Sequence, residues 1–308
     1  MQDSEFIKKY YNLISPIPSF LNKYLELNIM KRLKNIGYFC GMDYASKDIY
    51  NFPHYISRYD HSISVSLITW KYTHDKKQTI AALFHDISTP CFAHVIDYMN
   101  GDYMEQESTE KEAVAMLKNN QQLIELLKED NIDIKDIIDF KKYPIVDNDR
   151  PKLCADRLDG VFLTSLIWVQ NTELNDIKMI IKDIDVFENE KGIPELGFKN
   201  MEVAKIVYDI NNVINSYCQS NEDNYMMNLL GNITKYAIDK KVIAYEELYT
   251  LTEKELIKIF EEYAKKDEKF QKLFKEFKTK KKSDIPNIKY PTIKQRKINP
   301  LVKNKRLI

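Results

Sequence analysis

Residues 80–98 read IAALFHDISTPCFAHVIDY, and this stretch decides how the rest of the chain is interpreted. Its first part has the apolar spacing of a helix, so the adjacent His85 and Asp86 fall where that helix ends. A carboxylate is unfavourable at a helix C-terminus, because the helix dipole already places negative charge there. A divalent metal ion would offset that charge, and imidazole together with carboxylate is a ligand set for such ions. The pair therefore indicates a metal site whose other ligands lie elsewhere in the chain.

Two further segments carry residues of the same chemistry. The five histidines of the chain all precede residue 95. Residues 57–65 read SRYDHSISV and place Arg58 and His61 at the start of a helical pattern. Residues 154–159 read CADRLD and place Asp156 and Arg157 at the start of another. Along the chain the order is therefore histidine, then the histidine–aspartate pair, then aspartate.

This order resembles that of the HD-domain metal-dependent phosphohydrolases, and the similarity runs with gaps from about residue 32 to residue 162. Within that superfamily the chain looks nearest the deoxynucleoside triphosphate triphosphohydrolases, because RLKNIG (32–37), SRYDHSISV, the His-Asp segment and EQES (105–108) follow that branch's order. The resemblance implies one divalent metal ion, of which Mn, Fe, Mg, Zn and Ni are all options. Its implied ligands are His61, His85, Asp86 and Asp156.

The same resemblance implies how a substrate is held. Arg58 and Arg157 match cationic positions that contact substrate phosphates, and Asn35 falls near a position that approaches the sugar or base. Arginine suits this role because its planar guanidinium matches two phosphate oxygens at once. Alternatively, the two arginines are structural ion-pair partners for Asp60 or Asp159.

Proton transfer is the part of the pattern from which this sequence departs. Thr89 and Met104 stand where the triphosphohydrolase branch has histidines, so the acid and base groups of that branch are missing or moved. Other side chains near the His-Asp segment have the chemistry to replace them as general acid or base. The candidates are His94, Asp97, Glu105 and Glu107.

Helical periodicity dominates the chain, which predicts an all-α fold, an HD-domain helical bundle with accessory helices. Capping boxes mark two helix starts, Thr109 with Glu112 and Thr252 with Glu255. Residues 183–198 break the pattern and read as a short β-hairpin or a loop. The predicted helices cover residues 6–11, 21–36, 62–72, 79–86, 110–128, 152–170, 201–218, 225–239 and 253–263.

Charge is unevenly distributed along the chain. Residues 265–308 hold 16 Lys and Arg against 4 Asp and Glu, whereas the first 264 residues hold 30 against 42. Residues 291–302 alternate basic and apolar side chains, as a half-buried strand does. We favour an extended basic segment that docks on the acidic body and brings Arg296 to a bound phosphate. A solvated tail and a nucleic-acid-binding tail are the alternatives, the latter disfavoured by thin aromatic content.

Composition excludes several classes of protein. Hydrophobic residues make up 44% of the 308, yet no apolar run reaches the roughly 18–20 residues of a membrane span. Neither Gly-rich nucleotide-binding fingerprint occurs, which excludes the Rossmann and P-loop classes. The N-terminus is no signal peptide, and the four cysteines lack the spacing of a disulfide framework or a zinc knuckle. We therefore predict a cytoplasmic protein with no membrane partner.

These observations predict an enzyme that acts on a nucleotide or another small phosphate compound. We expect hydrolysis of deoxynucleoside triphosphates to deoxynucleoside and triphosphate by metal-activated water. Nucleoside monophosphate phosphatase and signalling-nucleotide hydrolase are alternatives, as is a catalytically weakened HD protein that binds nucleotide and regulates or scaffolds a partner. We further expect a homo-oligomer, with an HD core in residues 1–170, accessory helices in 171–264 and the basic segment in 265–308.

Overall fold

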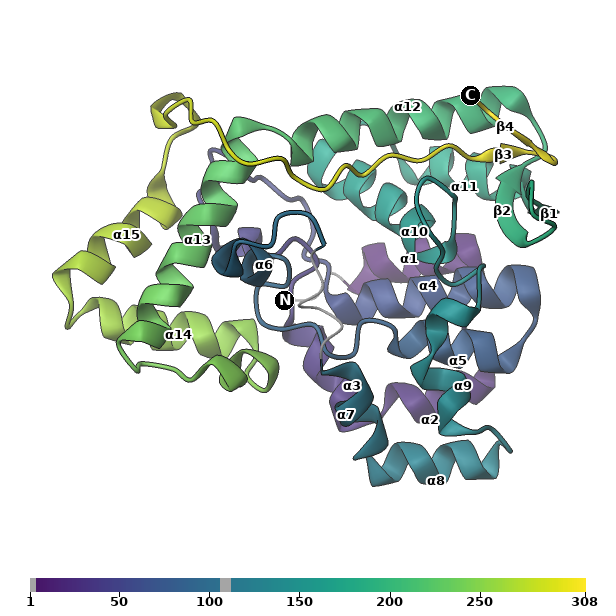
Figure 1. Ribbon diagram of the computed structural model, residues 1–308, viewed down its shortest axis with the longest axis horizontal. Coiled ribbons are helices and arrows are strands. Elements are labelled where there is room, and N and C mark those ends of the chain that lie inside the picture. Colours follow the sequence, from purple (N-terminus) through teal and green to yellow (C-terminus); the bar gives the residue numbers. More distant parts are fainter. Residues whose placement is uncertain (1–3, 106–111) are drawn as a thin grey trace.

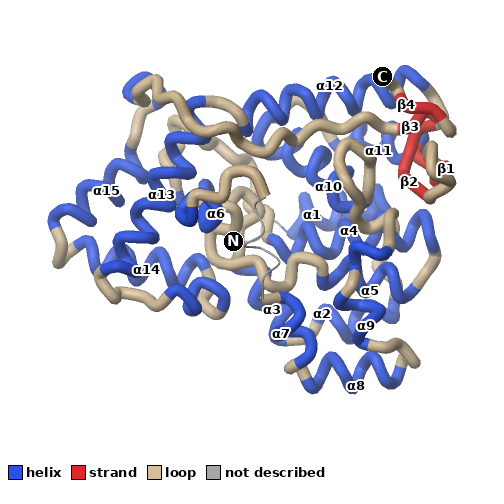
Figure 2. Tube along the Cα trace, viewed as in Figure 1, coloured by secondary structure: helices blue, strands red, loops and turns tan. Residues whose placement is uncertain are grey.

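The computed structural model describes residues 4–105 and 112–308, and helices dominate them (Figures 1 and 2). The predicted all-α class is confirmed, with one small sheet added at the edge of the molecule. The α-helices are α1 (Ser4–Ile14), α2 (Asn22–Leu25), α3 (Asn28–Arg32), α4 (Arg58–Thr73), α5 (Lys76–Phe84), α6 (Val95–Asn100), α7 (Ala113–Lys118), α8 (Gln121–Glu129), α9 (Ile134–Ile138), α10 (Ala155–Thr164), α11 (Leu174–Asp183), α12 (Met201–Cys218), α13 (Asn221–Asp239), α14 (Glu253–Ala264) and α15 (Glu268–Thr279).

Helix α4 lies at the centre of the fold and packs against α1, α5 and α10. It begins with a capping box, in which the Ser57 hydroxyl accepts from the Asp60 amide and the Asp60 side chain accepts from the Ser57 amide. Residues from Arg58 to Thr69 are all buried, polar ones included. Because the start of α4 is held from both sides, the side chains of its first turn have fixed positions.

Two predicted helices are shorter in the structure than the periodicity suggested. Residues 21–36 form α2, α3 and a 3₁₀ turn, because Leu27 is extended and interrupts the helix. Residues 113–129 form α7 and α8, separated where the Asn120 side chain accepts from the Leu123 amide and starts a new helix. Apolar spacing reports which residues are buried, and consecutive short turns can bury the same set as one helix.

One of the two predicted capping boxes is confirmed. At the start of α14, the Thr252 hydroxyl accepts from the Glu255 amide and the Glu255 side chain accepts from the Thr252 amide. The other box begins at Thr109, which lies outside the described residues, and Glu112 is found at the N-cap of α7.

The predicted hairpin is confirmed and extends into a four-stranded sheet. Strands β1 (Ile184–Glu188) and β2 (Pro194–Phe198) pair antiparallel, β3 (Leu301–Val302) joins β2 in parallel, and β4 (Lys305–Arg306) pairs with β3. Gly197 faces Leu301, and a Cβ on Gly197 would lie 2.8 Å from the Leu301 Cβ. Glycine therefore permits the close approach of the C-terminal strand.

The C-terminal segment is docked on the body rather than solvated. It runs along α12 from α15 to the sheet, drawn in yellow in Figure 1. Its own side chains Ile293, Ile298 and Leu301 are buried. Two asparagines of α12 hold its backbone: Asn211 Nδ2 donates to the Arg296 carbonyl at 2.7 Å, and the Arg296 amide donates to Asn215 Oδ1 at 2.7 Å. The side chain of Arg296 is therefore brought to a fixed place on the body.

Among the described helices, none has the length and apolarity that crossing a membrane requires.

Candidate metal centre

His85 follows directly after the last residue of α5 and is 6% exposed. Its Nδ1 lies 2.7 Å from the Ala82 carbonyl oxygen. A carbonyl oxygen can only accept, so Nδ1 carries the proton and Nε2 carries a lone pair. Nε2 is buried and has no hydrogen-bond partner among the described residues. A buried nitrogen without a partner is costly in a folded protein unless something binds it.

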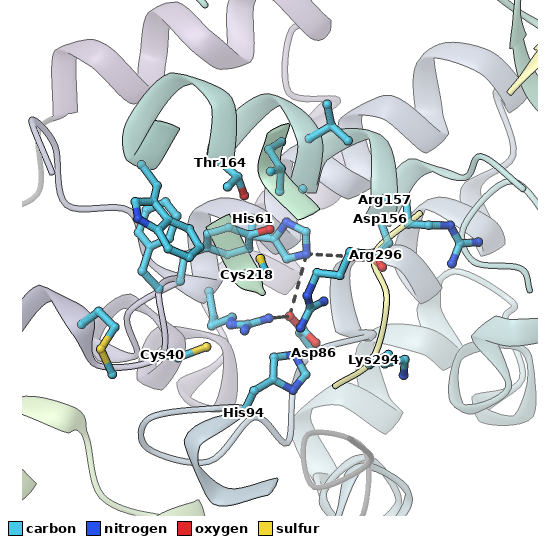
Figure 3. A pocket seen from close by; sticks show the side chains of 18 of the residues that line it. Cys40, His61, Asp86, His94, Asp156, Arg157, Thr164, Cys218, Lys294 and Arg296 are labelled. Carbon is cyan, nitrogen blue, oxygen red and sulfur yellow. Dashed lines mark hydrogen bonds and ion pairs between the residues drawn. The ribbon is translucent and has the colours of Figure 1, made fainter. Parts of the chain in front are cut away.

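Three other predicted ligands lie near this nitrogen, and Figure 3 shows these three, His61, Asp86 and Asp156, beside one another. His61 lies in the first turn of α4, Asp86 follows His85, and Asp156 lies in the first turn of α10. Asp156 Oδ1 is 3.0 Å from His61 Nε2 and 3.7 Å from His85 Nε2. Asp86 Oδ2 is 3.9 Å from His61 Nε2 and 3.8 Å from His85 Nε2. The four side chains predicted as ligands therefore converge.

This arrangement fits a divalent metal ion. His61, His85 and Asp86 offer ligand atoms that all lie within 4.8 Å of one another, and Asp156 adds a carboxylate near both histidines. This mixed set of imidazole and carboxylate suits transition metals, and the buried Nε2 of His85 has no hydrogen-bond partner among the described residues. Asp147 and Cys154 form a second group with Asp156. That group contains no imidazole, and burial raises the pKa of Asp147, which disfavours the ionised form that a metal ligand needs. The first group is therefore the candidate metal centre.

Charges around the centre keep its carboxylates ionised. Burial by itself would raise the pKa of Asp86, yet Arg58 and the two histidines outweigh burial and hold the pKa of Asp86 well below its usual range. Burial also opposes the imidazolium of His61, but hydrogen bonds to Asp156 and Asp159 raise the pKa of His61 to about 10. In the metal-free chain, protonated histidine thus supplies positive charge where an ion would supply it.

A cavity of about 290 Å³ opens from the centre and is lined by two kinds of side chain, one charged and the other aromatic. The charged lining consists of Arg58, His61, His85, Asp86, His94, Asp147, Arg150, Asp156, Arg157, Lys294 and Arg296. The aromatic lining includes Tyr38, Phe39, Tyr50, Phe52 and Trp168, whose rings form one connected group.

The two arginines predicted to bind phosphate both line this cavity, and both have protein partners. Arg58 Nη1 lies 2.7 Å from Asp86 Oδ2. The guanidinium of Arg157 donates to the Lys152 carbonyl and to Asn148, so it also holds the loop before α10. Ion pairing with Asp60 or Asp159, the predicted alternative, is wrong, because both arginines have other carboxylate partners.

The proton-transfer candidates divide into residues at the cavity and residues away from it. His94 lines the cavity, and its Nδ1 lies 2.9 Å from Asp97 Oδ2. Asp97 is 1% exposed and supports His94 from behind. Burial lowers the pKa of His94, so this imidazole is neutral near neutral pH. Glu105 is exposed and does not line the cavity, whereas Glu107 lies outside the described residues.

Arg296 and Asn35 are the other predicted substrate residues, and the structure separates them. Arg296 lines the cavity, together with Lys294 from the same docked segment. Asn35 is exposed in a 3₁₀ turn and does not line the cavity, so a substrate contact there is not supported. The chain enters the cavity wall three residues later, at Tyr38.

Several lining residues were not predicted. Arg150 lies in the loop before α10, Trp168 lies in the π-helical turn (Ser165–Val169) that continues α10, and Asp223 lies in the first turn of α13. An acidic residue in the first turn of a helix interacts favourably with the helix dipole. That ordinary explanation accounts for Asp223, so its place at a cavity could not be predicted from the sequence. These residues come from segments far apart in the chain.

Comparisons with known proteins agree with this geometry. Residues 58–190 match the HD domain family. The uncharacterized protein YdhJ of Bacillus subtilis is 23% identical over 249 residues, which cover 79% of this chain and 71% of that protein. The metal-dependent phosphohydrolase cns2 of Cordyceps militaris is 26% identical over 132 residues, which cover 43% of this chain and 37% of that protein. Residues 58–190, which carry the converging histidines and aspartates, therefore form an HD domain.

Proposed function

We propose that this protein hydrolyses nucleotides, and that a deoxynucleoside triphosphate, cleaved to deoxynucleoside and triphosphate, is the first substrate to test. The observation that supports the proposal is the lining of the cavity, which combines the candidate metal centre with five cationic side chains and a connected group of aromatic rings. A nucleotide matches both kinds of lining, because its phosphates are anionic and its base is a flat ring.

The cationic lining favours an anionic ligand with several oxygens. It consists of five Lys and Arg side chains, from α4, the loop before α10, α10 itself and the docked C-terminal segment: Arg58, Arg150, Arg157, Lys294 and Arg296. Arg150 shows how closely these cations are packed, because burial and the neighbouring Arg296 and Arg157 lower the pKa of Arg150 to about 10. Because these cations repel one another, their crowding lowers the stability of the empty site. A bound polyanion would relieve that repulsion and be bound more tightly for it.

The aromatic lining favours a flat ring. Phe39 and Phe52 stack with their ring centroids 4.5 Å apart, and Trp168 lies edge-on to Phe39 at 6.4 Å. Asp223 also lines the cavity, and Tyr50 donates to its carboxylate at 2.7 Å. An apolar wall with a few polar groups is the usual composition of a small-molecule site.

The roles of the protein side chains follow from these positions. A divalent ion held by His61, His85, Asp86 and Asp156 would supply Lewis-acid chemistry at a phosphate oxygen. Arg58, Arg157 and Arg296 would orient the phosphate group, on which phosphoryl transfer mainly depends. His94 keeps its Nδ1 on Asp97, so its Nε2 is the atom that would take or give a proton.

A binding function without turnover is the second candidate, and two replaced positions favour it. Thr89 is fully buried, its hydroxyl has no partner among the described side chains, and its carbonyl accepts from Arg32. Met104 is 50% exposed. Neither residue has a side chain that transfers protons, so His94 would have to act without the histidines found in the triphosphohydrolase branch.

Product identification tests the proposal. Purified protein is incubated with each of the four dNTPs, with nucleoside monophosphates and with ppGpp, in Mn²⁺ and in Mg²⁺, and the products are separated. Release of intact triphosphate supports the leading substrate, whereas release of single phosphates supports a phosphatase. The variant Asp156→Ala, assayed beside the wild type, identifies turnover by a contaminating enzyme. Nucleotide binding without turnover of any compound would overturn the enzymatic proposal in favour of the regulatory class.

A further inference from the structure

His61 has a second contact on the side that faces away from the candidate metal centre. Its Nδ1 lies 2.6 Å from Asp159 Oδ2. Asp159 lies on α10, one turn after Asp156, and its side chain is fully buried. The two carboxylates of one helix therefore hold the same imidazole at its two nitrogens.

Asp159 is held in turn by the N-terminal helix. The Tyr10 hydroxyl of α1 donates to Asp159 Oδ1, and Tyr10 is also fully buried. Each oxygen of the carboxylate thus has one partner, and the order of contacts runs from Tyr10 through Asp159 to His61. Buried polar groups that are fully paired keep a single arrangement, because leaving any one of them unpaired is costly.

This order of contacts decides which nitrogen of His61 can bind an ion. A carboxylate accepts, so His61 must donate from Nδ1. Nε2 is then the nitrogen that can lose its proton and bind an ion. This nitrogen lies beside Asp86 and Asp156, the carboxylates of the candidate metal centre. Ligating histidines commonly depend on such an outer partner for ring orientation and basicity.

The neighbouring tyrosine of α1 has a different partner. Tyr11 donates to Asp60 Oδ1 at 3.1 Å, and Asp60 belongs to the capping box of α4. Two consecutive buried tyrosines of one helix therefore make equivalent hydrogen bonds. Only the bond from Tyr10 leads to a nitrogen of the candidate metal centre.

We propose that Asp159 and Tyr10 are positioning residues, which keep the proton of His61 on Nδ1 and so direct its Nε2 to the metal ion. The inference rests on the metal centre of the proposed function. A purely structural role is the competing explanation, because any buried tyrosine–aspartate pair contributes to stability. The two explanations differ in what happens to metal affinity in a variant that still folds.

Mn²⁺ binding to the full, metal-free chain, measured by calorimetry, tests the inference. In Asp159→Asn the amide can donate to Nδ1, which moves the proton to Nε2, where the ion binds. We expect Mn²⁺ affinity about 10- to 100-fold weaker than in the wild type. In Tyr10→Phe the carboxylate keeps its contact with His61 but loses its support, so we expect a smaller loss, of at most about tenfold.

Matched controls are available for both variants. Asp97→Asn removes a buried carboxylate that contacts Nδ1 of another cavity histidine, His94, at 2.9 Å. Tyr11→Phe removes a buried tyrosine hydroxyl from the same helix. Both controls are expected to keep wild-type Mn²⁺ affinity, whatever their effect on the unfolding midpoint.

The outcomes are distinct. If the Asp159→Asn and Tyr10→Phe variants both fold and bind Mn²⁺ with wild-type affinity, the positioning role is overturned and the metal centre is unaffected. If Asp159→Asn does not fold, Tyr10→Phe decides, because it removes a single hydroxyl. Equal weakening in the test and control variants would also overturn the inference. Wild-type protein that binds no Mn²⁺ would contradict the metal centre itself.

Discussion

Arg58 and Asp86 form a buried ion pair at the edge of the candidate metal centre, with 2.7 Å between Nη1 and Oδ2. The arginine is 6% exposed and the aspartate 8%. The aspartate is thus both a predicted ligand and the partner of a predicted substrate residue. Its charge is compensated before any ion binds, which lets the site exist in the folded metal-free chain.

Removal of Arg58 should therefore make the stability of the fold depend more strongly on a bound metal ion than it does in the wild type. Arg58→Ala leaves Asp86 buried without its cation, and breaking a buried pair from one side costs about 3–5 kcal/mol. A bound divalent ion replaces the lost charge. We expect a lower unfolding midpoint in EDTA and a larger Mn²⁺-induced rise than in the wild type, measured by thermal denaturation. Equal rises in the two proteins would mean that Arg58 does not share Asp86 with the ion.

Asp156 offers a cleaner test of metal ligation, because its side chain is 36% exposed. Asp156→Ala should lose the ion while keeping the fold. It removes the contact with His61 Nε2 but leaves Asp159 on Nδ1, so we expect a loss of about 1–3 kcal/mol in unfolding free energy. Metal analysis of the purified protein checks this against about one ion per wild-type chain. Asp149→Ala is the control, since Asp149 is an exposed carboxylate of the preceding loop and does not line the cavity.

The docked C-terminal segment predicts a difference between two adjacent cations. Arg296 lines the cavity, whereas Lys297 is exposed and does not. A hydrogen bond to a charged group contributes about 1.5–3 kcal/mol, so Arg296→Ala should raise the KM for nucleotide by roughly 10- to 100-fold. Lys297→Ala should leave KM unchanged. Equal effects of the two substitutions would assign the segment a general electrostatic role.

The end of the C-terminal segment is held to the body by an ion pair with a buried carboxylate. Arg306 Nη2 donates to Glu195 Oε2 at 2.7 Å, and Glu195, fully buried in β2, also accepts from the Leu153 amide next to α10. Arg306→Ala leaves that carboxylate without its cation and should cost about 3 kcal/mol in urea unfolding. Adding Glu195→Gln should recover part of the loss. A double variant less stable than the single one would contradict this explanation.

Glu253, at the start of α14, predicts how stability changes with pH. Burial and the neighbouring Asp43 raise the pKa of Glu253 to about 8. Between its ordinary pKa and about pH 8, the unfolded chain releases the proton while the folded chain holds it, so stability falls as pH rises. Glu253→Gln removes this dependence. Its unfolding free energy should exceed that of the wild type by about 3–4 kcal/mol more at pH 8 than at pH 5.

The check is a pair of urea titrations at the two pH values. Glu255→Gln is the control, because Glu255 lies in the same first turn but its side chain is in the exposed capping box with Thr252. Hydrogen bonds in that box lower the pKa of Glu255, so its substitution should show no gain at pH 8. A constant difference between Glu253→Gln and the wild type across the two pH values would refute the prediction.

Local patterns predicted the elements that depend on nearby residues. The capping box at Thr252 and the hairpin of residues 184–198 are both read from a few neighbouring positions. The strand predicted from the alternation in residues 291–302 is wrong except at Leu301–Val302, and the buried Ile293 and Ile298 are five positions apart, which a period of two does not explain. Helix breaks at Leu27 and Asn120 were missed, because apolar spacing continues across them. The proposed boundaries at residues 170 and 264 stay predictions.

For the site, the four ligand positions came from a family resemblance, and the structure brings them together from α4, the end of α5 and α10. The partners of these residues could not be predicted. Helix packing decides these contacts. It brings Arg157 to the loop at Asn148, and it brings Tyr10 to Asp159 across 149 positions of the chain. Asn35 and Glu105 show the reverse case, since both are near site residues in sequence and lie outside the cavity.

By itself, the sequence determined that the chain is helical, which residue types could bind a metal ion, and that the basic C-terminus has a half-buried pattern. Tertiary structure alone decided that the centre has an outer layer of partners in Asp159, Tyr10 and Arg58, and that Arg296 faces the cavity while Lys297 does not. The reason is physical. Periodicity and capping act within a few residues, whereas the orientation of an imidazole or a guanidinium is fixed by hydrogen bonds between helices far apart in the chain.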